Sequence, residues 1–356
     1  MTESYTIRDL LAIMIEKNAT DLHLSVGIPP RIRVSKDLLT LDFQNLTPAK
    51  TKELCYQVMT ELQQEKFERK KDVDFSFGIP GLSRFRVNVF TQRGALSGAF
   101  RTIPLQVMGF EELGLPMVVK ELSDKPMGIT LVTGPTGCGK STTLAAMIDR
   151  INSSRKAHIV TIEDPIEYIH HHKLCTVNQR EIGSDTDSFT DALKSILRQD
   201  PDVVLLGEMR DMESIQAALT IAETGHSCFA TLHTNSCSQT ISRIIDVFPS
   251  EKQQQIRTQL AAALNGVITQ TLQPMISGGL HLCCEIMVAT PAVRALIREG
   301  KYHNLDNEIQ LGARFGMQTM NQSLAAAVKS NKITETVAMN RSMDIDDFMK
   351  CMMRSP

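Results

Sequence analysis

The feature that most constrains the fold is a short apolar run that leads through a glycine-rich loop into a helical pattern. The run at residues 129–133 is followed by GPTGCGKS at 134–141, and the helical pattern continues through STTLAAMIDRI. This order fits the phosphate-binding motif G-x-x-x-x-G-K-[ST] in the strand–loop–helix context that the motif requires. A chance glycine-rich turn rarely meets every fixed position in that context, so we expect a nucleotide-binding α/β domain.

The residue types of this loop suit a bound phosphate chain. Glycines allow backbone conformations that other residues resist, and the N–H groups of the loop and of the following helix attract anions. Lys140 can reach the β- and γ-phosphates, and the Ser141 hydroxyl can bind Mg²⁺. The expected nucleotide-binding residues are Gly134, Pro135, Thr136, Gly137, Cys138, Gly139, Lys140, Ser141 and Thr142.

The chain after residue 116 alternates short apolar strands with helices. Such strands, buried on both faces, indicate a mostly parallel sheet with helices on either side. The expected strands are 128–133, 157–163, 203–206 and 227–232. The expected helices are 140–152, 189–198, 212–223 and 253–272, and a helical tail is expected at 315–353.

The first part of the chain follows a different pattern. Between residues 72 and 103 apolar and polar residues alternate, which is typical of antiparallel strands with one face in water. The elements expected before them are a helix at 6–18, strands at 21–25 and 31–34, and one or two surface helices at 48–69. We therefore expect a small α+β domain at 1–103, a linker at 104–116 and an α/β domain at 117–356.

Charge and hydropathy exclude several classes of protein. The 38 basic and 40 acidic residues leave a net charge of −2, which argues against a nucleic-acid binder that relies on bulk positive charge. No apolar run reaches the roughly 18 residues of a transmembrane helix. The polar start MTESYTIRDL is no secretory signal, so a cytoplasmic location is expected. The eight cysteines lack C-x-x-C spacing and are expected to be free and buried.

Two acidic residues follow strands of the predicted parallel sheet. Glu163 ends the strand in AHIVTIEDPIEY, where a carboxylate can orient and deprotonate an attacking water, although a polar loop cap is the alternative. Glu208 follows the apolar strand of DVVLLGEMRD, which has the form of a Walker B strand that supports Mg²⁺ directly or through water. Because ligands bind outside the carboxyl ends of such strands, both are candidate active-site residues.

Two histidines flank the strand in ETGHSCFATLHT. His226 precedes the strand and His233 follows it. A lone histidine is more often a satisfied polar residue than a catalytic one. In a nucleotide-binding domain, sensing of the γ-phosphate is an equally open interpretation.

Four of these segments together resemble one family, the ATPases of type IV pili and type II secretion. They are GPTGCGKST, TIEDPIE, LLGEMRD and TGHSCFATLHT, in the order of the family. Nearly the whole chain takes part, because ATDLHLSVGIPPRIRV, RFRVNVFTQRG and AFRTIP resemble the N-terminal domain of that family. AVRALIREGK at 292–301 is similar to the AIRNLIRE element of the retraction subfamily, from which Val293 and Ala295 depart.

The resemblance implies a PAS-like α+β domain followed by a RecA-like ATPase domain that uses ATP and Mg²⁺. It implies that Glu163 is the general base, that Glu208 supports Mg²⁺ and that His226 and His233 sense the nucleotide. It also implies a homohexamer in which arginines reach the ATP of the next subunit, although a solvated strand face is the plain alternative. Those arginines are Arg84, Arg86 and Arg101.

Partners and location follow from the same resemblance. The ATPase would act on an inner-membrane pilus platform protein, with a paralogous retraction ATPase as a further partner, at the cytoplasmic side of the pilus base. The implied coupling element consists of Ala292, Val293, Arg294, Leu296, Ile297, Arg298 and Glu299. Its alternative interpretation is an ordinary amphipathic helix.

Other functions stay open at this point. An accessory retraction paralogue shares most of these segments. A pilus-assembly or type II secretion ATPase would carry a longer N-terminal region and a four-cysteine zinc site, and neither is found in this sequence. A metabolic P-loop kinase would need an acceptor pocket and a lid, for which there is no motif. A regulatory module that does not hydrolyse ATP is disfavoured by the intact Lys140, Ser141, Glu163 and Glu208.

Overall fold

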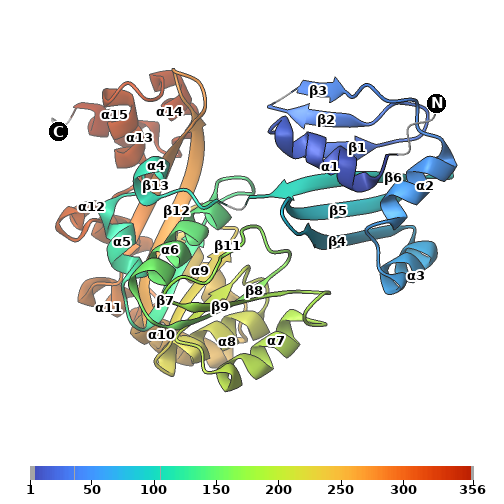
Figure 1. Ribbon diagram of the computed structural model, residues 1–356. Helices are drawn as coiled ribbons and strands as arrows, with labels where there is room; N and C mark the ends of the chain where they lie inside the picture. The colour runs from blue at the N-terminus through green and yellow to red at the C-terminus, as the bar shows by residue number, and fades with distance from the viewer. Residues whose placement is uncertain (1–4, 36, 105, 354–356) are drawn as a thin grey trace. The chain divides into compact units, whose positions relative to one another are not determined.

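The chain divides into two compact units. The computed structural model describes residues 5–35, 37–104 and 106–353. One unit comprises Met1–Gln106 and Glu167–Ile169, and the other comprises Val107–Ile166 and His170–Pro356. Each unit has its own sheet (Figure 1). Each unit also has its own hydrophobic core.

The first unit is built on a six-stranded antiparallel sheet in the order β3-β2-β1-β6-β5-β4. Its strands alternate buried apolar side chains, such as Phe85 and Val87, with polar ones, and the buried side packs with α1 and α2. This confirms the α+β class, although the sequence did not indicate β3. The elements are α1 (Ile7–Glu16), β1 (Asp21–Leu24), β2 (Arg31–Val34), β3 (Asp37–Thr40), α2 (Pro48–Tyr56), α3 (Glu61–Lys70), β4 (Asp72–Ile79), β5 (Ser83–Gln92) and β6 (Ala95–Ile103).

The second unit is built on a seven-stranded sheet whose strands mostly alternate with helices along the chain. Its seven-stranded sheet has the order β13-β12-β7-β11-β10-β8-β9 and is parallel except for the β12–β13 pair. The mostly parallel sheet is therefore confirmed. The first elements are α4 (Phe110–Leu113), α5 (Met117–Ser123), β7 (Gly128–Thr133), α6 (Lys140–Ser154), β8 (His158–Glu163), β9 (Thr176–Glu181), α7 (Phe189–Ile196), the 3₁₀ turn η1 (Leu197–Gln199), β10 (Val203–Leu206), α8 (Met212–Glu223) and β11 (Ser227–Leu232).

The remaining elements complete the sheet and add a helical tail. Helix α10 leads directly into β12, and the β12–β13 hairpin is followed by short helices. The expected helical tail is confirmed. These elements are α9 (Cys237–Asp246), α10 (Ser250–Ala263), β12 (Leu264–Pro274), β13 (Leu280–Val288), α11 (Pro291–Glu299), η2 (Tyr302–Asn304), α12 (Leu305–Leu311), η3 (Ala313–Phe315), α13 (Met320–Lys329), α14 (Glu335–Arg341) and α15 (Ile345–Met353).

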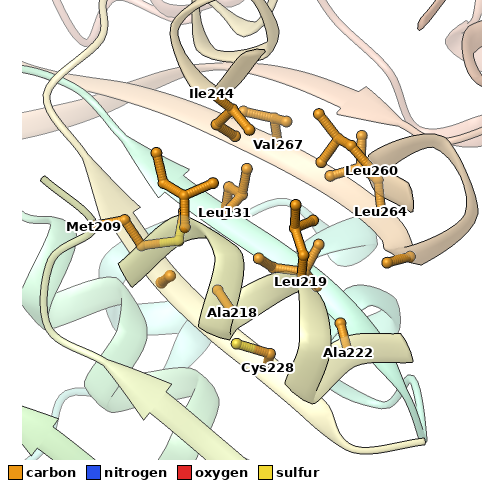
Figure 2. Packing of buried hydrophobic residues seen from close by; sticks show 14 of the residues in the cluster. Leu131, Met209, Ala218, Leu219, Ala222, Cys228, Ile244, Leu260, Leu264 and Val267 are labelled. Atoms are coloured by element: carbon orange, nitrogen blue, oxygen red, sulfur yellow. The ribbon is translucent and has the colours of Figure 1, made fainter. Parts of the chain in front are cut away.

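Helices cover both faces of this sheet. Neighbouring residues of one strand belong to different cores, because side chains along a strand point alternately to its two faces. In β7, Leu131 packs in one core and Val132 in the other. Figure 2 shows the first core, in which side chains of α8, α9 and α10 gather over β7, β11 and β12. This packing fixes the strands that lead to the loops described below.

The helix predicted at 253–272 is wrong in its second half. Helix α10 ends at Ala263, and the residues from Leu264 onward form β12. Nearly all residues of β12 are buried, and a short apolar run that is buried all round cannot be assigned to helix or strand by periodicity. Its β-branched side chains favour a strand. A Cβ at Gly266 would lie 2.8 Å from the carbonyl oxygen of Met287, so glycine lets β13 approach closely.

The described residues show three further properties that bear on function. All eight cysteines are free and buried, as predicted. Among the residues described, no helix is both long and apolar enough to cross a membrane. Within the same residues, no group of three or more metal-binding side chains is gathered together.

A core substitution tests the packing in Figure 2. Leu219 on α8 is 1% exposed, and Leu219→Ala removes its buried methyl groups. We expect the free energy of unfolding to fall by about 2–5 kcal/mol, the range for leucine-to-alanine changes in cores. Leu311→Ala is the matched control, because Leu311 is 78% exposed and surface changes stay within about 0.5 kcal/mol. Urea unfolding followed by circular dichroism measures both, and equal shifts would contradict the packing.

Candidate active site

The phosphate loop joins β7 to α6 and depends on glycine at its two ends. A Cβ on Gly134, which has φ +139°, would lie 2.4 Å from the carbonyl oxygen of Gln270 and 2.6 Å from the sulfur of Cys138. Gly139 caps α6 in the left-handed region, with φ +87°. Side chains at either position would be strained, so the sequence of the loop is dictated by its conformation.

Lys140 places a positive charge inside the loop. Its side chain is buried, and its ammonium group donates to the carbonyl oxygens of Gly134 at 2.8 Å and Pro135 at 3.0 Å. Ser141 follows on the first turn of α6, where unpaired backbone N–H groups and the helix dipole attract an anion. The loop is therefore built to bind a polyanion such as a nucleotide phosphate chain.

Glu163 is the last residue of β8 and is held by two neighbours. Its Oε1 accepts hydrogen bonds from the Thr161 hydroxyl at 2.7 Å and from the Gln179 amide at 3.1 Å. Gln179 lies on β9, directly beside Thr161 in the parallel register. The two donors fix the orientation of a half-buried carboxylate. Gln179 could not be identified from the sequence, because β9 was not predicted.

Glu208 follows β10 and forms a small charged cluster. Arg210 lies 2.8 Å from its Oε2, and the Nε2 of His233 lies 3.5 Å from its Oε1. Burial acts to raise the pKa of Glu208, but the hydrogen bond and charge of Arg210 together with His233 outweigh it, so that pKa is lowered. The lowered pKa favours the ionised carboxylate, which is the form that attracts a cation. Arg210 was missed, although it lies two residues from Glu208.

The topology brings these groups to one edge of the sheet. Strands β7, β11, β10 and β8 are adjacent and parallel, so their carboxyl ends lie together. The backbone N–H of Gly207 donates to the carbonyl of Ile162, and the hydroxyl of Thr231 donates to the carbonyl of Gly207. The phosphate loop, Glu163, Glu208 and His233 therefore follow neighbouring strands at the edge where doubly wound sheets bind ligands.

His226 lies at the other end of β11. Its backbone carbonyl accepts from Gly128, at the start of β7, and its Nδ1 lies 3.0 Å from the Thr224 hydroxyl. The six residues of β11 put it about 20 Å from the edge that carries His233, at about 3.3 Å per residue. The structure therefore brings His233, but not His226, to the nucleotide edge of its own chain.

The three arginines of the first unit share one face of its sheet. Arg86 on β5 is directly opposite Arg101 on β6, and Arg84 lies two residues from Arg86. The Nε of Arg101 is 2.8 Å from Asp21, and the Nε of Arg86 is 3.8 Å from Asp74. Burial acts to raise the pKa of Asp21, but Thr20 and Arg101 outweigh it and the pKa is lowered. The face therefore holds an ionised carboxylate that orients Arg101.

The segment implied as a coupling element forms α11. Val293 and Ile297 are buried in the core, whereas Ala292, Arg298 and Glu299 are exposed. The guanidinium of Arg294 donates to the backbone carbonyls at the end of α10 and the start of β12. Those carbonyls belong to Ala261, Ala262 and Leu264, and its Nε donates to Ala289. Arg294 thus caps α10, a contact between distant segments that sequence spacing does not reveal.

The fold and this edge define a P-loop ATPase of the RecA-like class. Residues 88–344 match the family described as Type II/IV secretion system protein. The chain belongs to that family.

Two relatives and one solved structure indicate which kind of ATPase within this family the chain resembles. The chain is 48% identical over 342 residues to the "Type IV pilus retractation ATPase PilT" of Pseudomonas aeruginosa, a match that covers 96% of this chain and 99% of that protein. It is 39% identical to the "Type IV pilus ATPase PilU" of the same organism, with 95% and 89% covered. The crystal structure of the pilus retraction motor PilT with bound ADP matches with a TM-score of 0.92 and 47% identity, over 98% of this chain and 100% of that one. The chain is therefore an ATPase of the pilus-retraction type.

The charged cluster around Glu208 predicts a pH effect. Arg210→Met removes the charge that lowers the pKa of Glu208, so that pKa rises and the carboxylate becomes protonated at higher pH. Since the ionised form is the one that attracts a cation, we expect the acid limb of the ATPase pH profile to move to higher pH. Arg314→Met, on η3, is the control. Acid limbs at the same pH in wild type and Arg210→Met would contradict the role of this cluster.

Proposed function

We propose that the chain acts as a hexameric, ATP-driven motor that retracts type IV pili. The observation that carries this proposal is the joining of the phosphate loop, Glu163 and Glu208 at one sheet edge in a chain that matches a retraction ATPase over nearly its full length. Identity is higher to the retraction ATPase than to the PilU relative, which favours the motor over an accessory role.

Mg²⁺ is the cation that suits this edge. The Ser141 hydroxyl and the ionised Glu208 carboxylate are oxygen ligands of the kind that Mg²⁺ prefers, and Mg²⁺ usually keeps several waters. Glutamate is longer than the usual aspartate, so we propose that Glu208 holds the ion through water. When bound, Mg²⁺ would neutralise the charge of the phosphates.

The chemical step is assigned to Glu163. Its carboxylate is oriented by Thr161 and Gln179, as a base must be to deprotonate a water in line with the γ-phosphate. Lys140 would bind the β- and γ-phosphates, since its ammonium already lies within the loop. We assign His233 to sensing the γ-phosphate, because its Nε2 lies 3.5 Å from Oε1 of Glu208.

A hexameric ring would give a function to the three arginines that share one face of the first unit's sheet. We propose that Arg84, Arg86 and Arg101 of one copy approach the ATP of the next copy and stabilise charge in the transition state. Asp21 would keep Arg101 in an extended orientation. ATP and ADP would then favour different arrangements of domains 1–103 and 117–356, with 104–116 as the hinge, because a ligand shifts such an equilibrium by its differential affinity.

The partner would be an inner-membrane platform protein at the base of the pilus. The exposed Arg298 and Glu299 of α11 offer a polar docking surface, whereas Arg294 is committed to α10. A paralogous retraction ATPase is a second partner by the same reasoning. With such a partner, the motor would act at the cytoplasmic face of the inner membrane.

Live imaging of pili in a strain that lacks this protein tests the function. We expect many long surface pili that no longer retract, because extraction of pilin subunits loses its motor. Complementation with Lys140→Ala, which supplies the protein without nucleotide binding, should leave the defect. Loss of surface pili would instead indicate an assembly ATPase, and normal retraction would contradict a motor role.

A further inference from the structure

Gln270 contacts the phosphate loop from a strand that no motif includes. It lies on β12, the neighbour of β7, and is 1% exposed. Its Nε2 donates to the carbonyl oxygen of Cys138 at 2.7 Å, and its Oε1 accepts from the Thr143 hydroxyl at 3.0 Å. One buried amide therefore joins the last part of the loop to the first turn of α6.

The backbone around Gln270 is fitted closely to the loop as well. A Cβ on Gly134 would lie 2.4 Å from the carbonyl oxygen of Gln270, and a Cβ on Gly139 would lie 3.2 Å from its Nε2. The strand itself is anchored beside β7 by the hydrogen bond between the hydroxyls of Thr133 and Thr269, at 2.8 Å. Gln270 thus belongs to a rigid surface against which the loop is folded.

Peptide geometry connects this contact to phosphate binding. In a planar trans peptide the C=O and the following N–H point in opposite directions. The carbonyl of Cys138 points to Gln270, so the N–H of Gly139 points away from the Gln270 side chain. Gly139 has φ +87° and, as a glycine, gives little resistance to a flip of this peptide. A flip would turn a carbonyl oxygen toward the phosphates.

We propose that Gln270 is a positioning residue of the phosphate loop. Its side-chain amide holds the Cys138–Gly139 peptide with the N–H directed at the nucleotide phosphates, and its contact with Thr143 keeps α6 in line with that peptide. Gln270 therefore controls nucleotide affinity more than the chemical step. The proposal rests on nucleotide binding by this loop and does not depend on what the ATPase moves.

Two methionine variants of the full-length protein separate this role from simple support of the fold. Gln270→Met keeps the size of the side chain but removes both hydrogen bonds. Gln318→Met is the matched control, because the Gln318 amide makes the same kind of bond, 2.8 Å to the carbonyl of Cys284. We expect Gln270→Met to raise the Kd for ADP and the KM for ATP about tenfold, about 1.4 kcal/mol, with a much smaller change in kcat. Gln318→Met should change the Kd and the KM by no more than about twofold, because Gln318 contacts Cys284 on β13 and not the phosphate loop.

A glutamate variant tests whether the hydrogen bond to Cys138 can be restored by lowering the pH. Gln270→Glu keeps an acceptor for Thr143, but an ionised carboxylate cannot donate to the Cys138 carbonyl, and a protonated one can. We expect its affinity for ADP to be weak at pH 8 and to recover toward wild type as the pH falls, while the protein stays folded by circular dichroism.

Failure of the positioning role and failure of the ATPase assignment give different results. Equal effects of Gln270→Met and Gln318→Met on Kd, or a Gln270→Glu affinity that stays weak in folded protein at low pH, would overturn the positioning role. Wild type that fails to bind ADP would instead contradict the ATPase assignment itself. Lys140→Ala provides the reference for complete loss of binding.

Discussion

Parallel hydrogen bonding among β7, β11, β10 and β8 is the constraint on which the second unit depends. Each strand is followed by a loop at the same edge, so residues far apart in the sequence become neighbours. The phosphate loop follows β7, Glu163 ends β8, Glu208 follows β10 and His233 follows β11. Helices on both faces hold the strands in register, and the loops inherit that rigidity.

Positive and negative charges lie on different loops of this edge. Lys140 and the start of α6 provide positive charge at the phosphate loop. Glu208 presents negative charge and is kept ionised by Arg210 and His233. An anion and a cation can therefore bind next to each other, which is what an ATP complex with a divalent ion requires.

Parts of the site whose structure depends on neighbouring residues alone could be predicted from the sequence. The loop 134–141 could be predicted because its glycines and its lysine are required by the motif itself, and Glu208 because it follows a short apolar strand. Contacts between distant segments were out of reach. The cap that Arg294 makes on α10, and the Thr161 and Gln179 contacts of Glu163, depend on strand order that spacing alone does not give.

The strand β12 shows the same limit most clearly. Its run LNGVITQTL is buried on both faces, so neither a period of two nor one of 3.6 residues is visible, and a helix was predicted. Correct assignment puts Gln270 against the phosphate loop. The same strand begins at Leu264, whose carbonyl is bound by Arg294 of α11. A single strand thus contacts both the phosphate loop and α11.

Single-turnover hydrolysis of ATP by Glu163→Gln tests the central claim, that this edge is the hydrolytic site. The variant keeps the size of the side chain and an oxygen for Thr161, but it cannot take a proton from water. The account predicts that ATP binding stays close to wild type while the hydrolysis rate falls by about 100-fold or more, as for loss of a general base. A single-turnover rate within a few-fold of wild type would contradict it.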